Sequence, residues 1–286
     1  MAEAGTRTTP AAAAATVAAT AVTAGGAAEE ASDPNFMTSL ARGLSVIRAF
    51  TEREPNLTIA DIAKTTGLPR AAARRCLLTL MQLGYAGSDG RSFYLKPKIL
   101  ALGYSFLSSA PLATILDPLI EQVSGAVQES CSAAVLDEDE LVYIARAATK
   151  RIMSVGLNVG SRLPAYCTSM GRVLLAALPE AELDAYLARV PLRPYTERTI
   201  TAADALKREL ERVRERGFSL VDQELELGLR SIAVPIRTAA GGVVASMNVS
   251  AQAARVTCPE MELQFLPRLT KAAEEARVLL VRARGI

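Results

Sequence analysis

The chain has 286 residues with a net charge of +2, and half of its residues are apolar. This length and composition allow two globular units with separate cores and exclude a protein that is disordered throughout. Histidine is absent, which removes Ser-His-Asp and Cys-His dyads and the commonest general base and metal ligand. We therefore expect no enzyme, no metal site and no cofactor. The four cysteines have no CxxC spacing, so neither structural disulfides nor a zinc finger is expected.

The charge is distributed unevenly along the chain. Residues 1–35 carry a net charge of −3, residues 36–98 carry +6 and the remainder carries −1. A local excess of positive charge is typical of a surface that contacts DNA phosphates.

Residues 1–35 are predicted to form a disordered Ala/Thr-rich arm. The apolar stretch 11–24 contains no leucine, is interrupted by threonines and follows Glu3 rather than a basic cluster, so we expect no signal peptide. The sequence contains no run of 18 strongly apolar residues, which predicts no membrane partner.

Residues 36–96 are predicted to form a winged helix-turn-helix domain with three helices. Leu40, Leu44 and Ile47 recur at helical spacing after Ser39, and we expect this stripe to complete the core. In the second helix Thr58 can act as N-cap with Asp61 at N3, and Gly67 ends the helix. Ile59, Ile62 and Ala63 form its expected buried stripe.

The third helix is predicted from Pro69, which suits the N1 position, to about Leu83, with Gly84 ending it. Its expected apolar face consists of Ala73, Cys76, Leu77 and Leu80.

The start of this third helix predicts a DNA-recognition surface. Arginine can pair with guanine in a major groove, and an alanine methyl group can meet thymine. The pattern alone also allows an ordinary charged surface helix. The turn at residues 88–91, between Tyr85 and the strand 93–95, predicts a hairpin at the place of a wing and favours DNA binding. The expected DNA-binding residues are Thr58, Arg70, Ala71, Ala72, Arg74, Arg75 and Arg91.

Residues 97–110 are predicted to form a linker helix. Ile99, Leu102, Gly103 and Phe106 form an apolar stripe after Lys96-Pro97-Lys98. The pattern is equally compatible with packing on a second subunit and packing on its own domain.

Residues 111–286 predict an α+β domain with a mostly antiparallel sheet and helices outside it. The expected strands are 131–136, 141–147, 151–157, 218–221, 231–237 and 243–250, with a loop marked by Gly160 and Pro164. Helices are expected to begin at Pro111, Ser169, Pro179, Thr201 and Pro259. Thr201 with Asp204 is expected to cap the helix that stops at Gly217.

Four segments carry a family resemblance: SLARGLSVIRAF, TIADIAKTTGLPRAAARRCLLTLMQLGY, TSMGRVLLAALP and RGFSLVDQELELGLRSIAVPI. Together they resemble the IclR family of bacterial transcription regulators, in which a winged helix-turn-helix is joined to a GAF-like effector domain. The segment RIMSVGLNVGSRLPAYCTSMGRVLLA is similar to the branch that regulates protocatechuate, 4-hydroxybenzoate and β-ketoadipate catabolism. Family members often carry Ser or Thr near the start of the recognition helix, where this chain has Ala71 and Ala72.

The resemblance implies a cytoplasmic, ligand-responsive activator or repressor of aromatic-catabolic genes that lies on the bacterial nucleoid when bound to DNA. Its implied partners are double-stranded operator DNA, a small aromatic or dicarboxylic acid as effector, and further copies of itself in a homodimer or homotetramer.

The resemblance also implies that the effector is held at one face of the sheet. Ser169, Met170 and Gly171 stand at a predicted helix start, whose free N–H groups favour a carboxylate. A plain N-cap role for Ser169 is equally compatible. Asn248 and Ser250 are two apart in a strand and share a face. The implied site consists of Ile152, Leu163, Ser169, Met170, Gly171, Val221, Asp222, Leu229, Ser231, Asn248 and Ser250.

Neighbouring polar residues are interpreted differently. Arg146, Arg151 and Arg162 are predicted to be solvated surface residues, with assistance to a bound anion as the alternative. Cys167 is predicted to be a small buried core residue. Two other functions stay open: a GAF-like enzyme or sensor, in which Cys167 or Asp222 performs chemistry and DNA binding only tethers it, and an architectural DNA-binding protein without an effector.

Overall fold

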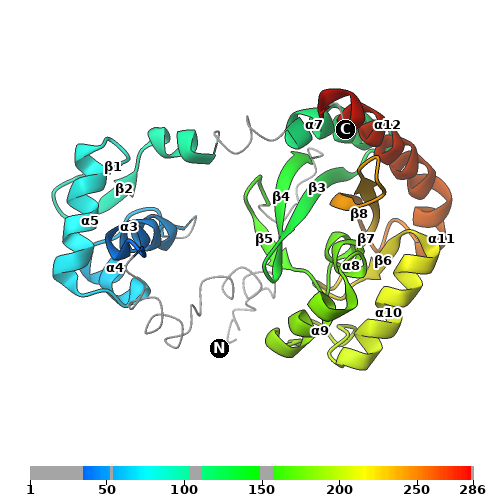
Figure 1. Ribbon diagram of the computed structural model, residues 1–286, viewed down its shortest axis with the longest axis horizontal. Coiled ribbons are helices and arrows are strands. Elements are labelled where there is room, and N and C mark those ends of the chain that lie inside the picture. Colours follow the sequence, from blue (N-terminus) through cyan, green and yellow to red (C-terminus); the bar gives the residue numbers. More distant parts are fainter. Residues whose placement is uncertain (1–34, 52–53, 104–110, 149–156, 285–286) are drawn as a thin grey trace, which may run out of the picture. The chain divides into compact units, whose positions relative to one another are not determined.

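The computed structural model describes residues 35–51, 54–103, 111–148 and 157–284 (Figure 1). These residues divide into two compact units, within 35–103 and 111–284. The predicted N-terminal arm up to residue 34, residues 104–110 of the predicted linker helix and nearly all of the predicted strand 151–157 lie outside the described residues. Among the described helices none is long and apolar enough to cross a membrane.

The first unit has the predicted order of three helices and a hairpin. It consists of α3 (Thr38–Ala49), α4 (Ile59–Thr66), α5 (Arg70–Gln82), β1 (Ala86–Ser88), β2 (Phe93–Leu95) and η2 (Pro97–Ile99), followed by helical residues 100–103. The predicted capping box is confirmed: the Thr58 N–H donates to Asp61 Oδ2 at 2.9 Å and the Asp61 N–H to Thr58 Oγ1 at 3.3 Å. Gly67 ends α4 with φ +70°, a left-handed conformation that glycine adopts without strain.

Two details of this unit differ from the sequence prediction. Leu40 and Leu44 are 58% and 49% exposed, and α3 instead contributes Val46 and Ala49 to the core shared with α4 and α5. Spacing shows which residues share a helix face, but the neighbouring helices decide which face is buried. Pro69 is the N-cap of α5 rather than its N1 residue, because its ψ of 139° is extended.

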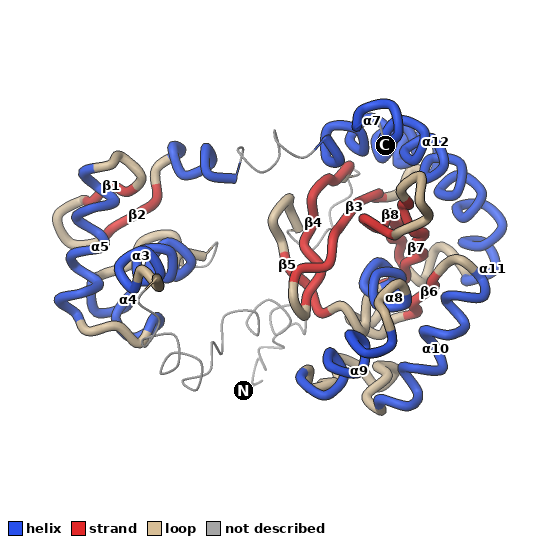
Figure 2. The backbone as a smooth tube through the Cα atoms, viewed as in Figure 1, coloured by secondary structure: helices blue, strands red, loops and turns tan. Residues whose placement is uncertain are grey.

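The second unit is built on one six-stranded sheet with the order β5-β4-β3-β8-β7-β6, in which every neighbouring pair is antiparallel (Figure 2). The strands are β3 (Ser130–Asp137), β4 (Glu140–Ala147), β5 (Arg162–Pro164), β6 (Ser219–Asp222), β7 (Leu229–Arg237) and β8 (Val243–Gln252). The helices are α7 (Pro111–Val127), α8 (Ser169–Ala176), α9 (Glu180–Arg189), α10 (Ala203–Arg216), α11 (Cys258–Glu260) and α12 (Leu266–Arg284), with a π-helical turn η3 (Met261–Phe265) before α12. This confirms the predicted α+β fold.

Helices cover both faces of this sheet (Figure 1). One apolar cluster joins the sheet to α7 and α12 and includes Leu116, Ile232 and Leu269. A second cluster lies on the opposite face and joins Ala134 and Ala233 of the sheet to α8, α9 and α10. Because both faces are covered, polar side chains on the sheet require partners.

Two local predictions in the second unit are wrong. The residues expected to form a loop near Pro164 include β5, which pairs with β4 through Leu163 and Leu141, because β4 offers a free edge there. Thr201 does not cap α10: the N-cap is Ala202, without a side-chain hydrogen bond. The helix starts one residue later than the pattern Thr201-x-x-Asp204 requires.

Candidate DNA-binding surface and effector site

An open hollow of about 460 Å³ lies where three parts of the first unit meet. Its lining comes from the start of α4 (Thr58, Ile59 and Ala60), the start of α5 (Arg70, Ala71 and Arg74) and the wing (Arg91). Five of the seven predicted DNA-binding residues are thus brought together. Arg75 is exposed and Ala72 half-buried outside this lining. The small residues shape the hollow and the arginines supply its charge.

Hydrogen bonds within the turn fix the wing that carries Arg91. Asp89 accepts the backbone N–H of Ser92 at 2.6 Å and that of Arg91 at 2.9 Å, and Gly90 has φ +94°. The backbone bond from Ser92, then that from Arg91 and the Ser92 hydroxyl, lower the pKa of the Asp89 carboxyl to about 2. The turn therefore holds the backbone of Arg91 in place while its guanidinium stays exposed.

The arginines of this surface have no carboxylate partner among the described residues. Among the ion pairs formed by the described residues, none involves Arg70, Arg74, Arg75 or Arg91. Arg70 and Arg74 are four residues apart on α5 and both are exposed, so they lie on one side of the helix. These unpaired cations are available to phosphates and to base edges.

In the second unit, polar residues lie side by side on the sheet face that packs against α8, which we call the inner sheet face. Arg146 of β4 is opposite Ser132 of β3, and Ser132 is opposite Asn248 of β8. We call these three residues the polar row. Both Ser132 and Asn248 are buried, with 2% and 4% of their surface exposed. On the same face Ser250 lies opposite Ser231, and Ser231 opposite Val221, which brings together three of the predicted ligand residues.

The first turn of α8 packs over this face. Met170 belongs to the same buried cluster as Ala233, the β7 residue opposite Asn248. Thr168 is the N-cap, but its hydroxyl donates to Pro164 O, and its oxygen accepts no hydrogen bond from an N–H of the helix. Ser169 is therefore not a plain N-cap. Its Oγ is buried without a hydrogen-bond partner among the described residues.

Gly171 has a structural reason to be glycine. A Cβ atom at this position would lie 2.1 Å from the carbonyl oxygen of Ala165. The backbone of α8 therefore approaches the preceding loop more closely than any side chain allows. This contact accounts for Gly171 without a ligand.

Unpartnered polar atoms mark the same sheet face. Asn248 Nδ2 donates to Ser250 Oγ at 3.1 Å, whereas Asn248 Oδ1 is buried and has no partner among the described residues. Ser219 of β6 lies opposite Ala233, and its Oγ is also buried without a partner among the described residues. Sequence patterns did not indicate Ser219 as a site residue. Buried polar atoms are almost always hydrogen-bonded, so this face is suited to a polar ligand.

Three predicted ligand residues do not join this group. Asp222 follows Val221 in β6, so its side chain points to the opposite face of the sheet. There it pairs with Arg230 at 2.7 Å and with Arg198 at 2.6 Å. Leu163 lies opposite Leu141 of β4. Leu141 is five residues from Arg146 along this strand, so Leu163 is about 16 Å from the position of Arg146. Ile152 lies outside the described residues. Leu229, two residues before Ser231, shares its face and is half-buried.

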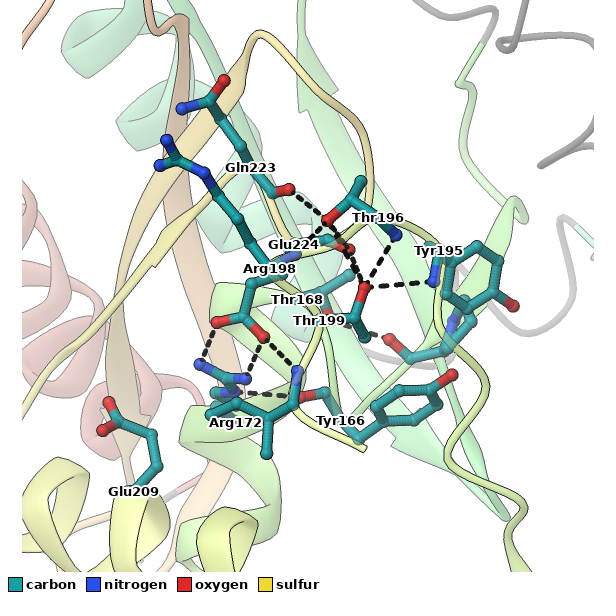
Figure 3. Close-up of polar contacts among 12 residues, drawn as sticks. Tyr166, Thr168, Arg172, Tyr195, Thr196, Arg198, Thr199, Glu209, Gln223 and Glu224 are labelled. Carbon is teal, nitrogen blue, oxygen red and sulfur yellow. Dashed lines mark hydrogen bonds and ion pairs between the residues drawn. The ribbon is translucent and has the colours of Figure 1, made fainter. Parts of the chain in front are cut away.

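A buried ion pair ties α8 to the loops beside it (Figure 3). Arg172, 1% exposed, donates from both Nη atoms to the Glu224 carboxylate at 2.7 and 2.5 Å, and from Nε to Tyr166 O. Glu224 Oε2 also accepts the Ile200 N–H at 3.1 Å. The Thr199 hydroxyl donates to the Glu224 carbonyl at 2.6 Å. Sequence patterns gave no signal for this pair.

The other chemically suggestive residues are occupied or inert. Burial raises the pKa of the Cys167 thiol to about 12, so it is not poised as a nucleophile. Arg162 forms ion pairs with Asp137 at 2.6 Å and with Glu140 at 2.8 Å. Among the described residues no group of three or more Cys, Asp or Glu is placed to hold a metal ion.

A winged helix-turn-helix with unpaired arginines, joined in one chain to a sheet domain with a polar inner face, defines a DNA-binding regulator with a sensing domain. Two family models match the chain: the IclR helix-turn-helix domain over residues 39–90 and the bacterial transcriptional regulator IclR C-terminal domain over residues 104–277. The chain belongs to the IclR family of bacterial transcriptional regulators.

Individual relatives agree with this assignment. The Pca regulon regulatory protein of Pseudomonas putida is 53% identical over 244 residues, covering 85% of this chain and 84% of that protein. The p-hydroxybenzoate hydroxylase transcriptional activator of Acinetobacter baylyi is 34% identical over 88% of this chain and 95% of its own length. A crystal structure of an IclR homolog from Microbacterium hydrocarbonoxydans, complexed with 4-hydroxybenzoate, is 27% identical with a TM-score of 0.74, covering 86% of this chain and 99% of that one.

Proposed function

We propose that this regulator controls genes of aromatic-acid catabolism and that it responds to a small aromatic or dicarboxylic acid bound on the inner sheet face of its second unit. It acts in the bacterial cytoplasm, on the nucleoid when bound to DNA, and performs no catalysis. The relatives named above, which regulate pca and p-hydroxybenzoate genes, support the choice of pathway.

The hollow of the first unit supports direct reading of a major groove. The guanidinium groups of Arg70 and Arg74 can each donate two hydrogen bonds to the edge of a guanine, and the methyl group of Ala71 can contact a thymine methyl. Arg75 and Arg91, beside and across the hollow, are suited to phosphates. Thr58, at the N-terminus of α4, contributes a hydroxyl to the rim. Ala72 is half-buried and lies outside the lining of the hollow, so we expect it to contribute less than Ala71.

The observation that carries the sensing function is the presence of buried polar atoms without partners on one sheet face. Asn248 Oδ1 and Ser169 Oγ come from β8 and from the first turn of α8, more than 70 residues apart, and both are buried on the side where α8 packs on the sheet. Leaving such atoms unsatisfied costs about 1–3 kcal/mol each, which a ligand with hydrogen-bonding groups recovers on binding. The 4-hydroxybenzoate complex of a relative supports an aromatic acid as that ligand.

The protein is proposed to act as a homodimer or homotetramer on a pseudo-palindromic operator. Two recognition helices would enter major grooves about 34 Å apart. An effector that changes operator affinity must have its own affinity changed by DNA by the same factor, typically corresponding to about 1–3 kcal/mol.

The test is an operator-binding assay with the full chain on the intergenic DNA next to its own gene, with and without protocatechuate, 4-hydroxybenzoate and β-ketoadipate. One acid should shift the operator affinity about 5- to 150-fold and raise the melting temperature of the protein. Operator binding with no response to any acid in either assay would favour an architectural protein. Chemical turnover of an acid would favour the enzyme alternative.

A further inference from the structure

Arg146 is a half-buried cation at the edge of the inner sheet face, whereas the sequence alone favoured a solvated role over assistance to an anion. Its Nη1 lies 3.3 Å from Ser132 Oγ, the neighbouring member of the polar row. Among the described residues no carboxylate lies within ion-pair distance of it. A guanidinium that is partly removed from water without a counter-ion is unfavourable unless an anion joins it.

Other half-buried or buried arginines of this unit have partners. Arg162, on the adjacent strand β5, is held by Asp137 and Glu140, Arg172 by Glu224, and Arg230 by Asp222. Among the described residues Arg146 has one long hydrogen bond, to the Ser132 hydroxyl, and this bond engages one of its five N–H donors. The three paired arginines have carboxylates as neighbours, whereas the residue opposite Arg146 on β3 is a serine.

The strand register directs Arg146 toward the unpartnered atoms. Neighbouring strands are about 4.8 Å apart, so the position of Asn248 is about 10 Å from that of Arg146, with Ser132 between them. The bond to Ser132 Oγ shows that the guanidinium extends over β3 toward β8. An effector whose carboxylate lies over Ser132 would accept hydrogen bonds from the guanidinium of Arg146 on one side. The remainder of the effector would reach Asn248 and Ser250.

We propose that Arg146 is the counter-ion of the effector's carboxylate and that it makes this site select acids over their neutral analogues. The inference rests on the proposed sensing function and names the group within that site that recognises charge. The planar fork of arginine matches a carboxylate in two parallel hydrogen bonds, and partial burial weakens the screening of their charges by water.

The test compares each acid with its uncharged amide in calorimetric titrations of the full chain. The probe is whichever of 4-hydroxybenzoate, protocatechuate and β-ketoadipate binds the wild type most tightly, together with the corresponding amide. The variants are Arg146→Gln and Arg146→Lys. Arg162→Gln is the matched control, because it removes a half-buried arginine from the adjacent strand that is already paired.

The expected result is a loss of about 10- to 100-fold in acid affinity for Arg146→Gln with amide affinity unchanged, so that the acid-to-amide preference falls toward one. Arg146→Lys should retain part of the preference, and Arg162→Gln all of it. Retention of the wild-type preference by Arg146→Gln, or equal weakening of acid and amide binding by both variants of Arg146, would overturn the proposal. If the wild type binds none of the acids, the sensing function itself fails, which is a separate outcome.

Discussion

Arg70, Arg74 and Arg91 in the first unit lie around an open hollow and pair with no described carboxylate, whereas Arg172 in the second unit is 1% exposed and held by both oxygens of Glu224. The first arrangement leaves charge available to a partner from outside. The second uses charge to join α8 to the loops around Ile200 and Glu224. Arginine content alone therefore does not locate a binding surface, and the presence or absence of an internal counter-ion distinguishes the two uses.

Arg146 combines features of both regions. It lies in the sheet unit, yet it has no counter-ion among the described residues, as in the DNA-binding unit. The absence of a counter-ion among the described residues is the property that the two proposed binding sites share. A site for an anion, whether phosphate or carboxylate, needs cations whose charge the fold has not already neutralised.

The largest effect is expected on stability, from removing the counter-ion of the buried Arg172. Glu224→Ala leaves the Arg172 guanidinium buried without a counter-ion and the Ile200 N–H without its acceptor, and should destabilise the second unit by about 3–5 kcal/mol. Denaturant unfolding of the full chain measures this change.

A double replacement provides the control for this prediction. Arg172→Met with Glu224→Leu should recover part of the loss, because no buried charge remains while Tyr166 O and the Ile200 N–H stay unpaired. Glu274→Ala, which breaks an exposed pair with Arg277 on α12, should change the stability by less than about 1 kcal/mol. A Glu224→Ala protein as stable as the wild type would show that the buried pair contributes nothing.

A smaller effect is expected from removing an exposed arginine of the first unit. It concerns DNA binding rather than stability. Arg74→Ala should weaken operator binding by about 1–3 kcal/mol and relax the preference at one base pair, with the unfolding free energy nearly unchanged because the side chain is exposed. Quantitative mobility shifts on the operator and on single-base variants measure both. Arg208→Ala, an exposed arginine of α10, should alter neither. Unchanged affinity and base preference in Arg74→Ala would reject α5 as the recognition helix.

The smallest effect is expected at the wing and depends on pH. Hydrogen bonds from Ser92 and Arg91 hold the pKa of Asp89 at about 2, below its ordinary value of about 3.9. The charged carboxylate therefore stabilises the turn above about pH 4, and this contribution is lost as the pH falls toward 2. An NMR titration of the Asp89 carboxyl should show a midpoint near 2. Ser92→Ala should raise it only partly, since the backbone bonds remain. A wild-type midpoint near 4 would contradict the observed turn.

The sequence by itself determined the features that depend on neighbours along the chain. The capping box of Thr58 and Asp61, the left-handed Gly67 and the hairpin between Tyr85 and Leu95 follow from local backbone preferences. The residues proposed to bind DNA were predicted in the same way, because Arg70, Ala71 and Arg74 lie within two turns of one helix. The shared face of Asn248 and Ser250 followed from the period of a strand.

Only the tertiary structure decided which distant residues meet. Arg172 and Glu224 are 52 residues apart, and Arg146 and Ser132 are 14 apart on different strands. Their contacts depend on strand register and on helix placement, which no local pattern encodes. For the same reason the sequence could not tell that Leu44 faces solvent or that Asp222 pairs with Arg198, which is 24 residues away. Local patterning thus specified the elements and the helix that is proposed to read DNA, while the long-range pairing of strands assembled the polar face on which the sensing function is proposed.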